Sequence, residues 1–378
     1  MSTPAAFPGG AGLFRLAPEV AHLNHGSFGA VPTPVARVHQ DLLAEAAADP
    51  DAFFLGVPDR LAEARGRVAA HLGTDPEGLA FVTNATEAAG LALDALRLDA
   101  DDEILVTDHG YGTVVAAAAR RARTVTVALD PALCRTRTPC ARRCSPDSPP
   151  DQGGPPRPHQ LAHRPDRRGP RLLAELRERG ITTVVDGAHA PGMLAEPLAG
   201  RPDFWFGNLH KWAYAPPGSA VLAVAPGHRA RVPAPVPSWE DHRGFRARSS
   251  TGPPPTTRAG SPPRGPRPDR PARRRGGPRP QRRTRTPRGR VAGRAPGLTP
   301  LPYTEGLAMR SLRLPRSLAR TQQEAAALRE EIAARLGCRV LIWPWPDGGG
   351  IRISGQVYNR AEEYERLVAG LRRLLAEG

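Results

Sequence analysis

Lysine is almost absent from this chain. Of 53 Lys and Arg residues, one is a lysine, Lys211, and arginine supplies every other basic side chain. A guanidinium stays protonated and cannot attack a carbonyl, whereas an amine that loses its proton can form a Schiff base. The scarcity leaves one side chain for that chemistry. The alternative is that a single lysine survived by chance.

Cysteine and long apolar runs are also scarce. Four cysteines, three of them in one unusual segment, form no disulfide framework and match no zinc pattern, so we expect a reducing cytoplasm and no metal site. No stretch approaches the roughly 20 apolar residues of a membrane span, and we expect neither a membrane partner nor a signal peptide. With 378 residues and a mean hydropathy of -0.41, the chain is expected to form two domains of a soluble enzyme.

The formal net charge of +16 would ordinarily indicate nucleic-acid binding. The excess is confined to two segments: Arg246 to Arg294 holds 16 Arg and one acid, and Cys134 to Arg171 holds nine Arg and three Asp. No aromatic residue stands among the arginines from 246 to 294, so the stacking platforms of single-strand binders are missing there. Nucleic acid is therefore not the expected partner, and an Arg-rich nucleic-acid-binding protein is the alternative of another class.

Hydrophobic periodicity disappears in two islands, residues 131–170 and 246–296. Both are rich in Pro, Arg and Gly, which predicts disorder. One hypothesis is a pair of flexible insertions. The other is translation out of frame, because residues 159–168, read from the second codon base, can encode a Ser-Pro-Thr-Gly turn and a strand, and residues 255–261 can hide an Asp-Tyr-Pro segment. An inactive product of a frameshifted gene is therefore a further alternative.

Outside the islands, strands and helices alternate at the spacing of a doubly wound α/β sheet. We predict a large domain with its N-terminal segment within residues 1–245, and a smaller C-terminal α+β domain within residues 297–378. The predicted helices are 61–72, 87–96, 172–179, 318–336 and 360–375, and the predicted strands are 78–83, 103–107, 181–185, 219–225, 340–343 and 350–354.

Two motifs directly follow predicted strands in the first third of the chain. In residues 83–88, the N–H groups of a helix start and a Thr hydroxyl can seat a phosphate, although a plain N-cap with Glu87 nearby explains the same pattern. In residues 107–111, His109 or Tyr111 can lie flat on a planar ring, and a structural aromatic is the alternative.

Two further motifs carry the charged groups. Asp186 ends a buried apolar strand, and a desolvated carboxylate needs a cation, which a protonated pyridine nitrogen would supply. A helix N-cap or a structural ion pair is the alternative. His189, three residues on, can reach a phenolic oxygen of the same ring. Lys211 follows an aromatic strand and precedes a Pro-Gly turn at residues 216–218.

Together these motifs resemble the class V aminotransferase family of pyridoxal-phosphate (PLP) enzymes, and most closely its isopenicillin N epimerase-like branch. Residues 23–29 resemble the N-terminal signature of that branch, and residues 352–359 resemble its substrate-carboxylate segment. The cofactor motifs match in order and spacing at residues 84–87, 186–189 and 207–212. The resemblance covers residues 10–128, 171–245 and 297–378.

The resemblance implies a fold type I homodimer that binds PLP and acts on an amino acid or an amino-acid-like substrate. Lys211 would form the Schiff base and move the α-proton, Asp186 would keep the ring nitrogen protonated, and His189 would tune the phenolic oxygen. Arg352 would clamp the substrate carboxylate, or would be an ordinary strand-surface arginine. The other implied contacts are Ala85, Thr86, Asn208 and His210 at the phosphate, His109 and less favourably Tyr111 on the ring, and Asn24 and His25 at the substrate.

The chain departs from the family pattern inside the islands. Family members have a Ser-Pro-Thr-Gly strand and a Thr-rich, Asp-containing segment there, so the chain as written is expected to lack a core strand and a phosphate ligand for the partner subunit. Epimerase, lyase and transaminase activities are not distinguished by the motifs. Cysteine desulfurase is the enzymatic alternative, but it needs a nucleophilic cysteine, and neither Cys338 nor the island cysteines Cys134, Cys140 and Cys144 have a suitable context.

Overall fold

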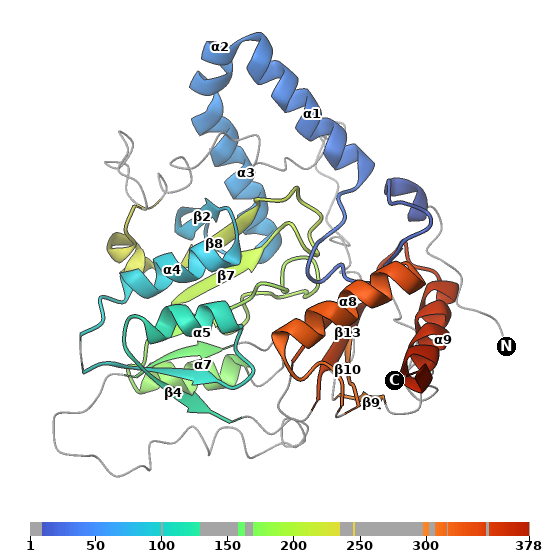
Figure 1. The fold of residues 1–378 in the computed structure, drawn as a ribbon. Coiled ribbons are helices and arrows are strands. Elements are labelled where there is room, and N and C mark those ends of the chain that lie inside the picture. The colour runs from blue at the N-terminus through green and yellow to red at the C-terminus, as the bar shows by residue number, and fades with distance from the viewer. Residues whose placement is uncertain are drawn as a thin grey trace. The chain divides into compact units, whose positions relative to one another are not determined.

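The computed structural model describes residues 10–99, 101–128, 158–162, 169–234, 245, 298–301, 307–315, 317–344 and 348–377, which cluster in two compact units (Figure 1). The larger unit takes its described residues from Arg37–Pro263, and the smaller from Met1–Ala36 and Arg264–Gly378. The boundary falls in the first turn of α1 (Thr33–Ala48). The N-terminal segment, which the sequence analysis groups with the large domain, clusters with the C-terminal unit because its strand β1 pairs there.

Within the described part of the larger unit, seven strands form a mixed sheet in the order β2-β8-β7-β6-β5-β3-β4. Strand β8 is antiparallel to β2 and β7, and the other neighbours are parallel. Apart from β8, the strands therefore all end at the same edge, the carboxyl edge. The bounds are β2 (Leu79–Val82), β3 (Glu103–Thr107), β4 (Arg123–Val127), β5 (Pro158–Ala162), β6 (Thr183–Asp186), β7 (Phe204–Asn208) and β8 (Ala220–Val224).

Both faces of this sheet are buried at β7. Along β7, Phe204 and Phe206 pack into one cluster with α4, and Trp205 packs into another with α3, as the alternation of a strand requires. Burial on both sides explains why β7 has no polar alternation. The predicted mixed α/β sheet is confirmed. The helices of this unit are α2 (Pro50–Leu55), α3 (Val57–Leu72), η2 (Pro76–Gly78), α4 (Ala85–Ala95), α5 (Gly112–Ala119), α7 (Gly169–Glu178) and η4 (Pro226–Arg231).

One strand corrects the sequence analysis. Residues Pro158–Ala162 lie in the first island, yet they form β5, which pairs in parallel with β3 on one side and β6 on the other. The expected lack of a core strand is therefore wrong. The two flanking strands each present backbone N–H and C=O groups that need partners, and any extended segment can supply these. The other predictions for the islands lie outside the described residues, except at residues 169–170, which belong to α7.

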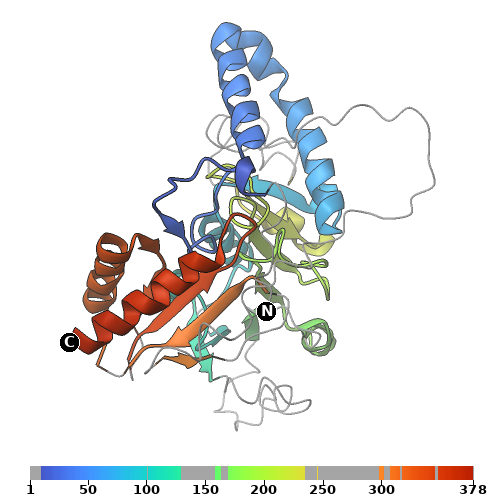
Figure 2. The same ribbon diagram turned by 90° about the vertical axis from the view of Figure 1, so that its right-hand side faces the viewer.

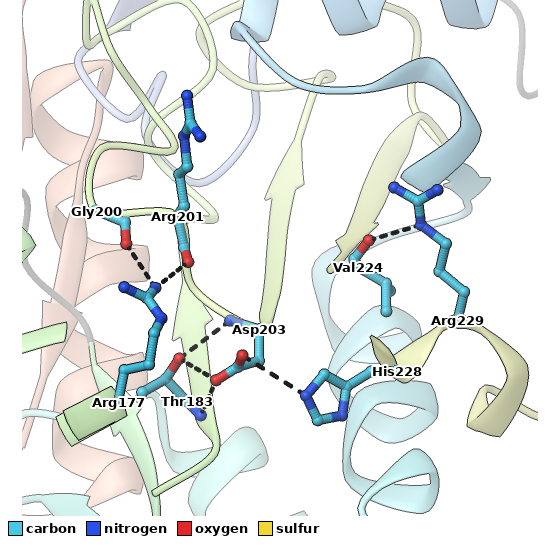
Figure 3. A network of polar contacts seen from close by, with 8 residues as sticks. All are labelled: Arg177, Thr183, Gly200, Arg201, Asp203, Val224, His228 and Arg229. Carbon is cyan, nitrogen blue, oxygen red and sulfur yellow. Dashed lines mark hydrogen bonds and ion pairs between the residues drawn. The ribbon is translucent and has the colours of Figure 1, made fainter. Parts of the chain in front are cut away.

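The amino ends of β6 and β7 are joined by a polar network (Figure 3). One carboxylate oxygen of Asp203 accepts hydrogen bonds from N and Oγ1 of Thr183, each at 2.8 Å, and Oγ1 of Thr183 accepts one from N of Asp203 at 3.0 Å. Nearby, Nη2 of Arg177 donates to the carbonyl oxygens of Gly200 at 3.0 Å and Arg201 at 2.6 Å. These bonds hold the two strands in register at the end opposite to the carboxyl edge.

The smaller unit has an antiparallel sheet in the order β12-β13-β10-β9 and a parallel pair, β1 with β11. Helices α8 and α9 pack together against this sheet around Ile332, Ile351 and Leu367 (Figure 2). The elements are η1 (Ala11–Leu13), β1 (Ala21–His22), β9 (Thr299–Pro300), β10 (Met309–Arg313), α8 (Gln322–Leu336), β11 (Cys338–Arg339), β12 (Leu341–Trp343), β13 (Gly350–Ser354) and α9 (Ala361–Glu377).

Helix α8 begins four residues later than predicted. Oγ1 of Thr321 accepts a hydrogen bond from N of Glu324 at 3.1 Å, and the Glu324 carboxylate accepts one from N of Arg320 at 2.8 Å, which is a capping arrangement. The helix therefore starts after Thr321 and excludes Leu318. In the part of the chain that the structure describes, we find no helix with the length and apolarity needed to cross a bilayer.

Candidate active site

The carboxyl edge of the large sheet gathers the predicted cofactor residues of the larger unit. Asp186 is the last residue of β6, Asn208 is the last of β7, and Ala85 begins the helix that follows β2. Because β8 runs the other way, its amino end, preceded by Ser219, lies at the same edge. Residues from four strands thus surround one end of the sheet.

The loop after β7 holds Lys211. The backbone N–H groups of Leu209 and His210 donate to the carbonyl oxygen of Ser219 at 3.0 and 3.1 Å, and N of Ala215 donates to the carbonyl oxygen of Leu209 at 3.1 Å. This tight loop places the half-buried Lys211 with its Nζ 3.5 Å from Nε2 of His189. The structure therefore brings together two side chains that lie 22 residues apart.

His189 has a second neighbour. The indole nitrogen Nε1 of the buried Trp212 donates a hydrogen bond to Nδ1 of His189 at 3.1 Å. The two ring nitrogens of His189 therefore face Trp212 on one side and Lys211 on the other. The imidazole is held at an orientation that its own loop alone would not impose.

Asp186 is buried, with 9% of its surface exposed, and its Oδ1 accepts a hydrogen bond from N of Ala188 at 2.9 Å. The loop after it packs on Trp205, since a Cβ on Gly187 would lie 2.4 Å from the indole. A side chain at Gly187 would displace either the indole or the loop that carries Asp186. The aromatic character of β7 and the glycine after Asp186 thus have one common structural reason.

The sequence allowed two interpretations of the start of α4, a plain N-cap and a phosphate-binding helix start, and the structure has features of each. Oδ1 of Asn84 accepts from N of Glu87 at 2.9 Å, and the Glu87 carboxylate accepts from N of Thr83 at 2.7 Å, so a cap is present. Oδ1 of Asn208 also accepts from N of Ala85 at 2.9 Å and ties this helix to β7. Thr86 is exposed. The cap orders the helix start and leaves it at the edge where Lys211 stands.

Several buried polar atoms at this edge have no hydrogen-bond partner among the described residues. They are Oγ1 of Thr107, Nδ1 of His109, Nδ1 of His210 and Oγ of Ser219. Burial lowers the pKa of His210, and the charge of Lys211 lowers it further, while a hydrogen bond to the backbone of Ser219 opposes the shift. Buried polar groups are nearly always hydrogen bonded. The cluster of buried polar atoms without partners is therefore a candidate binding site for a polar ligand.

Tyr111 does not share this setting. It is 57% exposed and caps α5 through its backbone, with no side-chain hydrogen bond to the helix. His109 is half-buried, and its Nδ1 lies 3.6 Å from Oδ1 of Asp108. Of the two residues predicted to lie on a ring, His109 is therefore the more buried.

The predicted substrate residues Asn24, His25 and Arg352 lie in the smaller unit. Arg352 stands on β13, and its Nη2 donates a hydrogen bond to Oγ of Ser27 at 2.9 Å. Burial lowers the pKa of Arg352 to about 10, and its Nε has no hydrogen-bond partner in the described structure. Ser27 thus holds the guanidinium at Nη2, while Nε is buried without an acceptor. A solvated surface arginine would instead have water at each donor.

The segment that carries Asn24 and His25 is fastened to the same sheet. Nδ1 of the fully buried His25 lies 2.8 Å from Oη of Tyr358, and N of Gly26 donates to Oγ of Ser354 at 3.0 Å. Oδ1 of Asn24 is buried and has no hydrogen-bond partner among the described groups. An N-terminal loop and a C-terminal strand, more than 300 residues apart, form one polar cluster.

Sequence reasoning missed Ser27, Trp212, Ser219 and Tyr358. Ser27, Trp212 and Tyr358 stand inside the quoted motifs, and a polar or aromatic side chain beside a motif residue was the available signal. Ser219 had none, because its position depends on β8 being antiparallel to its neighbours.

No family model matches the sequence. Two relatives span nearly the whole chain. An isopenicillin N epimerase from Streptomyces clavuligerus is 32% identical over 97% of this chain and 98% of its own length, and one from Amycolatopsis lactamdurans is 34% identical over 95% and 96%. The chain belongs to the isopenicillin N epimerase-like branch of the class V aminotransferase family. The family predicted from the motifs is thereby confirmed.

The class V fold is also found among solved structures. The cystine C–S lyase C-DES, solved with glycine covalently linked to its PLP cofactor, matches with a TM-score of 0.70 at 16% identity, over 98% of this chain and 99% of that one. The class V family is PLP-dependent, and this chain is accordingly a PLP-dependent enzyme, as predicted. The carboxyl edge fits the cofactor: it offers the amine of Lys211, the buried carboxylate of Asp186 and polar atoms without partners.

Proposed function

We propose that this class V enzyme moves the α-proton of an amino acid or amino-acid-like substrate, with Lys211 as both the cofactor-binding amine and the base. The observation that carries the proposal is the placement of the chain's sole lysine, with its Nζ 3.5 Å from a histidine at the edge where Asp186 is buried. An amine beside an imidazole, in a partly water-excluded loop, can lose and regain a proton.

Asp186 is proposed to hold the cofactor's ring nitrogen. PLP, when bound, supplies an aldehyde for amino groups and a pyridinium ring that withdraws electrons from the α-carbon. The buried carboxylate of Asp186 favours the protonated nitrogen, because a buried anion is stabilised by a cationic partner. His189 is proposed to contact the phenolic oxygen, and His109 to lie against the ring.

The phosphate is proposed to sit at the start of α4. The helix N-terminus provides N–H groups at Ala85 and Thr86, and the hydroxyl of Ser219 and Nδ1 of His210 lack partners at the same edge. Asn208 is proposed to act mainly by positioning, because its side chain already accepts the Ala85 N–H.

Arg352 is proposed to bind the substrate carboxylate. Ser27 accepts a hydrogen bond from Nη2, and the guanidinium keeps Nε for an incoming acceptor. Arginine suits this task because its planar donors match a carboxylate bidentately. Asn24 and His25 are proposed to line the same substrate region, on the cluster that Tyr358 and Ser354 fasten.

Epimerisation is the proposed reaction, since the relatives that span the chain are named isopenicillin N epimerases. The second candidate is β-elimination of a sulfur leaving group, suggested by the fold shared with a C–S lyase. A desulfurase that uses a thiolate is less well supported by the described residues. Cys338 is fully buried in β11, and burial raises the pKa of its thiol.

A homodimer in the cytoplasm is proposed from the family resemblance and the low cysteine content. Analytical ultracentrifugation of the purified full chain should give twice the monomer mass of 40.4 kDa. A monomeric species that retains PLP would contradict the dimer.

Covalent PLP binding at Lys211 tests the enzymatic proposal. Purified full-length protein should be yellow, and borohydride should fix the cofactor on the peptide that contains Lys211. Lys211→Arg keeps the charge but removes the reactive amine, and should abolish both the fixation and turnover. Protein that stays colourless with added PLP would overturn the proposal.

The hypothesis of an inactive product of a frameshifted gene remains a prediction. Sequencing the gene across both islands tests it directly. A chain with both frames restored should then exceed the written chain in solubility and PLP retention. Equal retention by the two chains would contradict the hypothesis.

A further inference from the structure

We infer that Trp212 sets the tautomer of His189, so that Nε2 of His189 carries the hydrogen and donates toward Lys211 and the cofactor. The tautomer follows from this chain's own contacts. The identity of the group that receives the hydrogen bond rests on the proposed function.

The direction of the Trp212 contact follows from the chemistry of the indole. An indole nitrogen carries a hydrogen and accepts no hydrogen bond, so Nε1 of Trp212 can only donate. At 3.1 Å, Nδ1 of His189 must be the acceptor and must therefore lack a hydrogen. A neutral imidazole with an unprotonated Nδ1 carries its hydrogen on Nε2.

The position of Trp212 is firmly held. The residue is 3% exposed, and Gly192, at φ +78°, lies so close that a Cβ there would be 2.2 Å from the carbonyl oxygen of Trp212. The turn that contains Gly192 is itself closed by hydrogen bonds from N of Met193 and N of Leu194 to O of Ala190, at 3.1 and 3.0 Å. A buried indole N–H without a partner would be destabilising, so the hydrogen bond to His189 also stabilises the folded chain.

The tautomer has a consequence for Lys211. Nε2 of His189 lies 3.5 Å from Nζ of Lys211, and with a hydrogen on Nε2 this contact needs a lone pair on Nζ. A protonated Lys211 would bring hydrogens to this contact from both sides, so the hydrogen bond from Nε2 forms when Lys211 has lost its proton. Nε2–H therefore stabilises the neutral amine relative to the ammonium, and the neutral amine is the form that attacks an aldehyde. With PLP held, the same Nε2–H can donate to the phenolic oxygen. Trp212 is thus a positioning residue that acts through His189.

The test is imidazole-nitrogen NMR on the full chain with 15N-labelled histidine. The spectrum contains 11 histidines, and His189→Gln identifies the signals of His189. We expect native protein, both without and with PLP, to show Nε2 protonated and Nδ1 unprotonated. Trp212→Phe keeps an aromatic ring but removes the donor, and it should give His189 a mixture of tautomers and slow PLP capture by Lys211 about tenfold, the worth of about one hydrogen bond.

Trp205→Phe is the matched control. Trp205 is equally buried, but its Nε1 has no hydrogen-bond partner in the described structure, so this variant removes an indole without removing a donor to His189. It should leave the His189 tautomer unchanged. Native His189 with a hydrogen on Nδ1, or a Trp212→Phe variant that keeps the native pattern, would overturn the inference. Because the native spectrum is informative without cofactor, a chain that binds no PLP would refute the proposed function and leave the tautomer measurable.

Discussion

The two ends of β6 and β7 differ in how their polar groups are satisfied. At the amino end, Thr183 and Asp203 exchange three hydrogen bonds of 2.8–3.0 Å (Figure 3). At the carboxyl end, Nδ1 of His210 and Oγ of Ser219 are buried and have no partner among the described residues. The same strands thus carry a closed network at one end and an open one at the other. The closed network stabilises the fold, and the open one is where we propose that the cofactor completes the hydrogen bonding.

The largest effect should separate two aspartates of this sheet. Asp186→Ala should lower turnover about a thousandfold, the order seen when a preorganised electrostatic group is lost, with little change in the free energy of unfolding. Asp203→Ala should instead lower the free energy of unfolding by about 2 kcal/mol, because Thr183 loses its acceptor. Steady-state kinetics and urea denaturation of both variants provide the measurements. If both variants lost stability and had the same turnover, the two ends of β6 and β7 would not differ in role.

A smaller effect should separate two hydroxyl groups. Ser219→Ala removes a buried hydroxyl without a partner, so it should leave stability unchanged or slightly raised while weakening PLP binding about tenfold. Thr183→Val removes a bonded hydroxyl of similar shape and should cost about 1 kcal/mol of stability without changing PLP affinity. Equilibrium dialysis against PLP checks the first variant, and thermal or urea unfolding checks the second. Unchanged PLP affinity in Ser219→Ala would remove Ser219 from the phosphate site.

The smallest effect concerns pH. The pKa of His210 is lowered from its ordinary value of 6.5, chiefly by burial and then by the charge of Lys211. As pH falls below 6.5, the unfolded chain therefore takes up the proton before the folded chain does, and the contribution of His210 to stability decreases. His210→Gln should flatten this part of the pH dependence. Urea unfolding at about pH 7 and pH 5 gives the change in the free energy of unfolding for the native protein and for His210→Gln. An identical change in both proteins would contradict the lowered pKa of His210.

Prediction from the sequence succeeded where the signal is local. The strand 103–107 and the helix that ends at Leu72 appear as expected, because periodicity and flanking turns determine them. The start of α8 could have been predicted from the capping pattern of Thr321 and Glu324. Helices α1 and α2 received no prediction, and β5 was expected to be absent. A central strand forms because the backbone N–H and C=O groups of its neighbouring strands need hydrogen-bond partners. The composition of residues 158–162 carries no signal of those neighbours.

The sequence by itself determined which chemistry this protein can perform. The sequence has a single lysine amine together with motifs for a ring nitrogen and a phosphate in a consistent order. These features and their resemblance to a known family indicate the cofactor without the tertiary structure. The tertiary structure alone decided which of those groups meet and which stay unsatisfied. Trp212 bonds His189 across 23 positions, and Ser219 reaches the site because β8 is antiparallel. The physical reason is that side-chain identity is a local property, whereas hydrogen-bond partnership depends on strand direction and packing between distant segments.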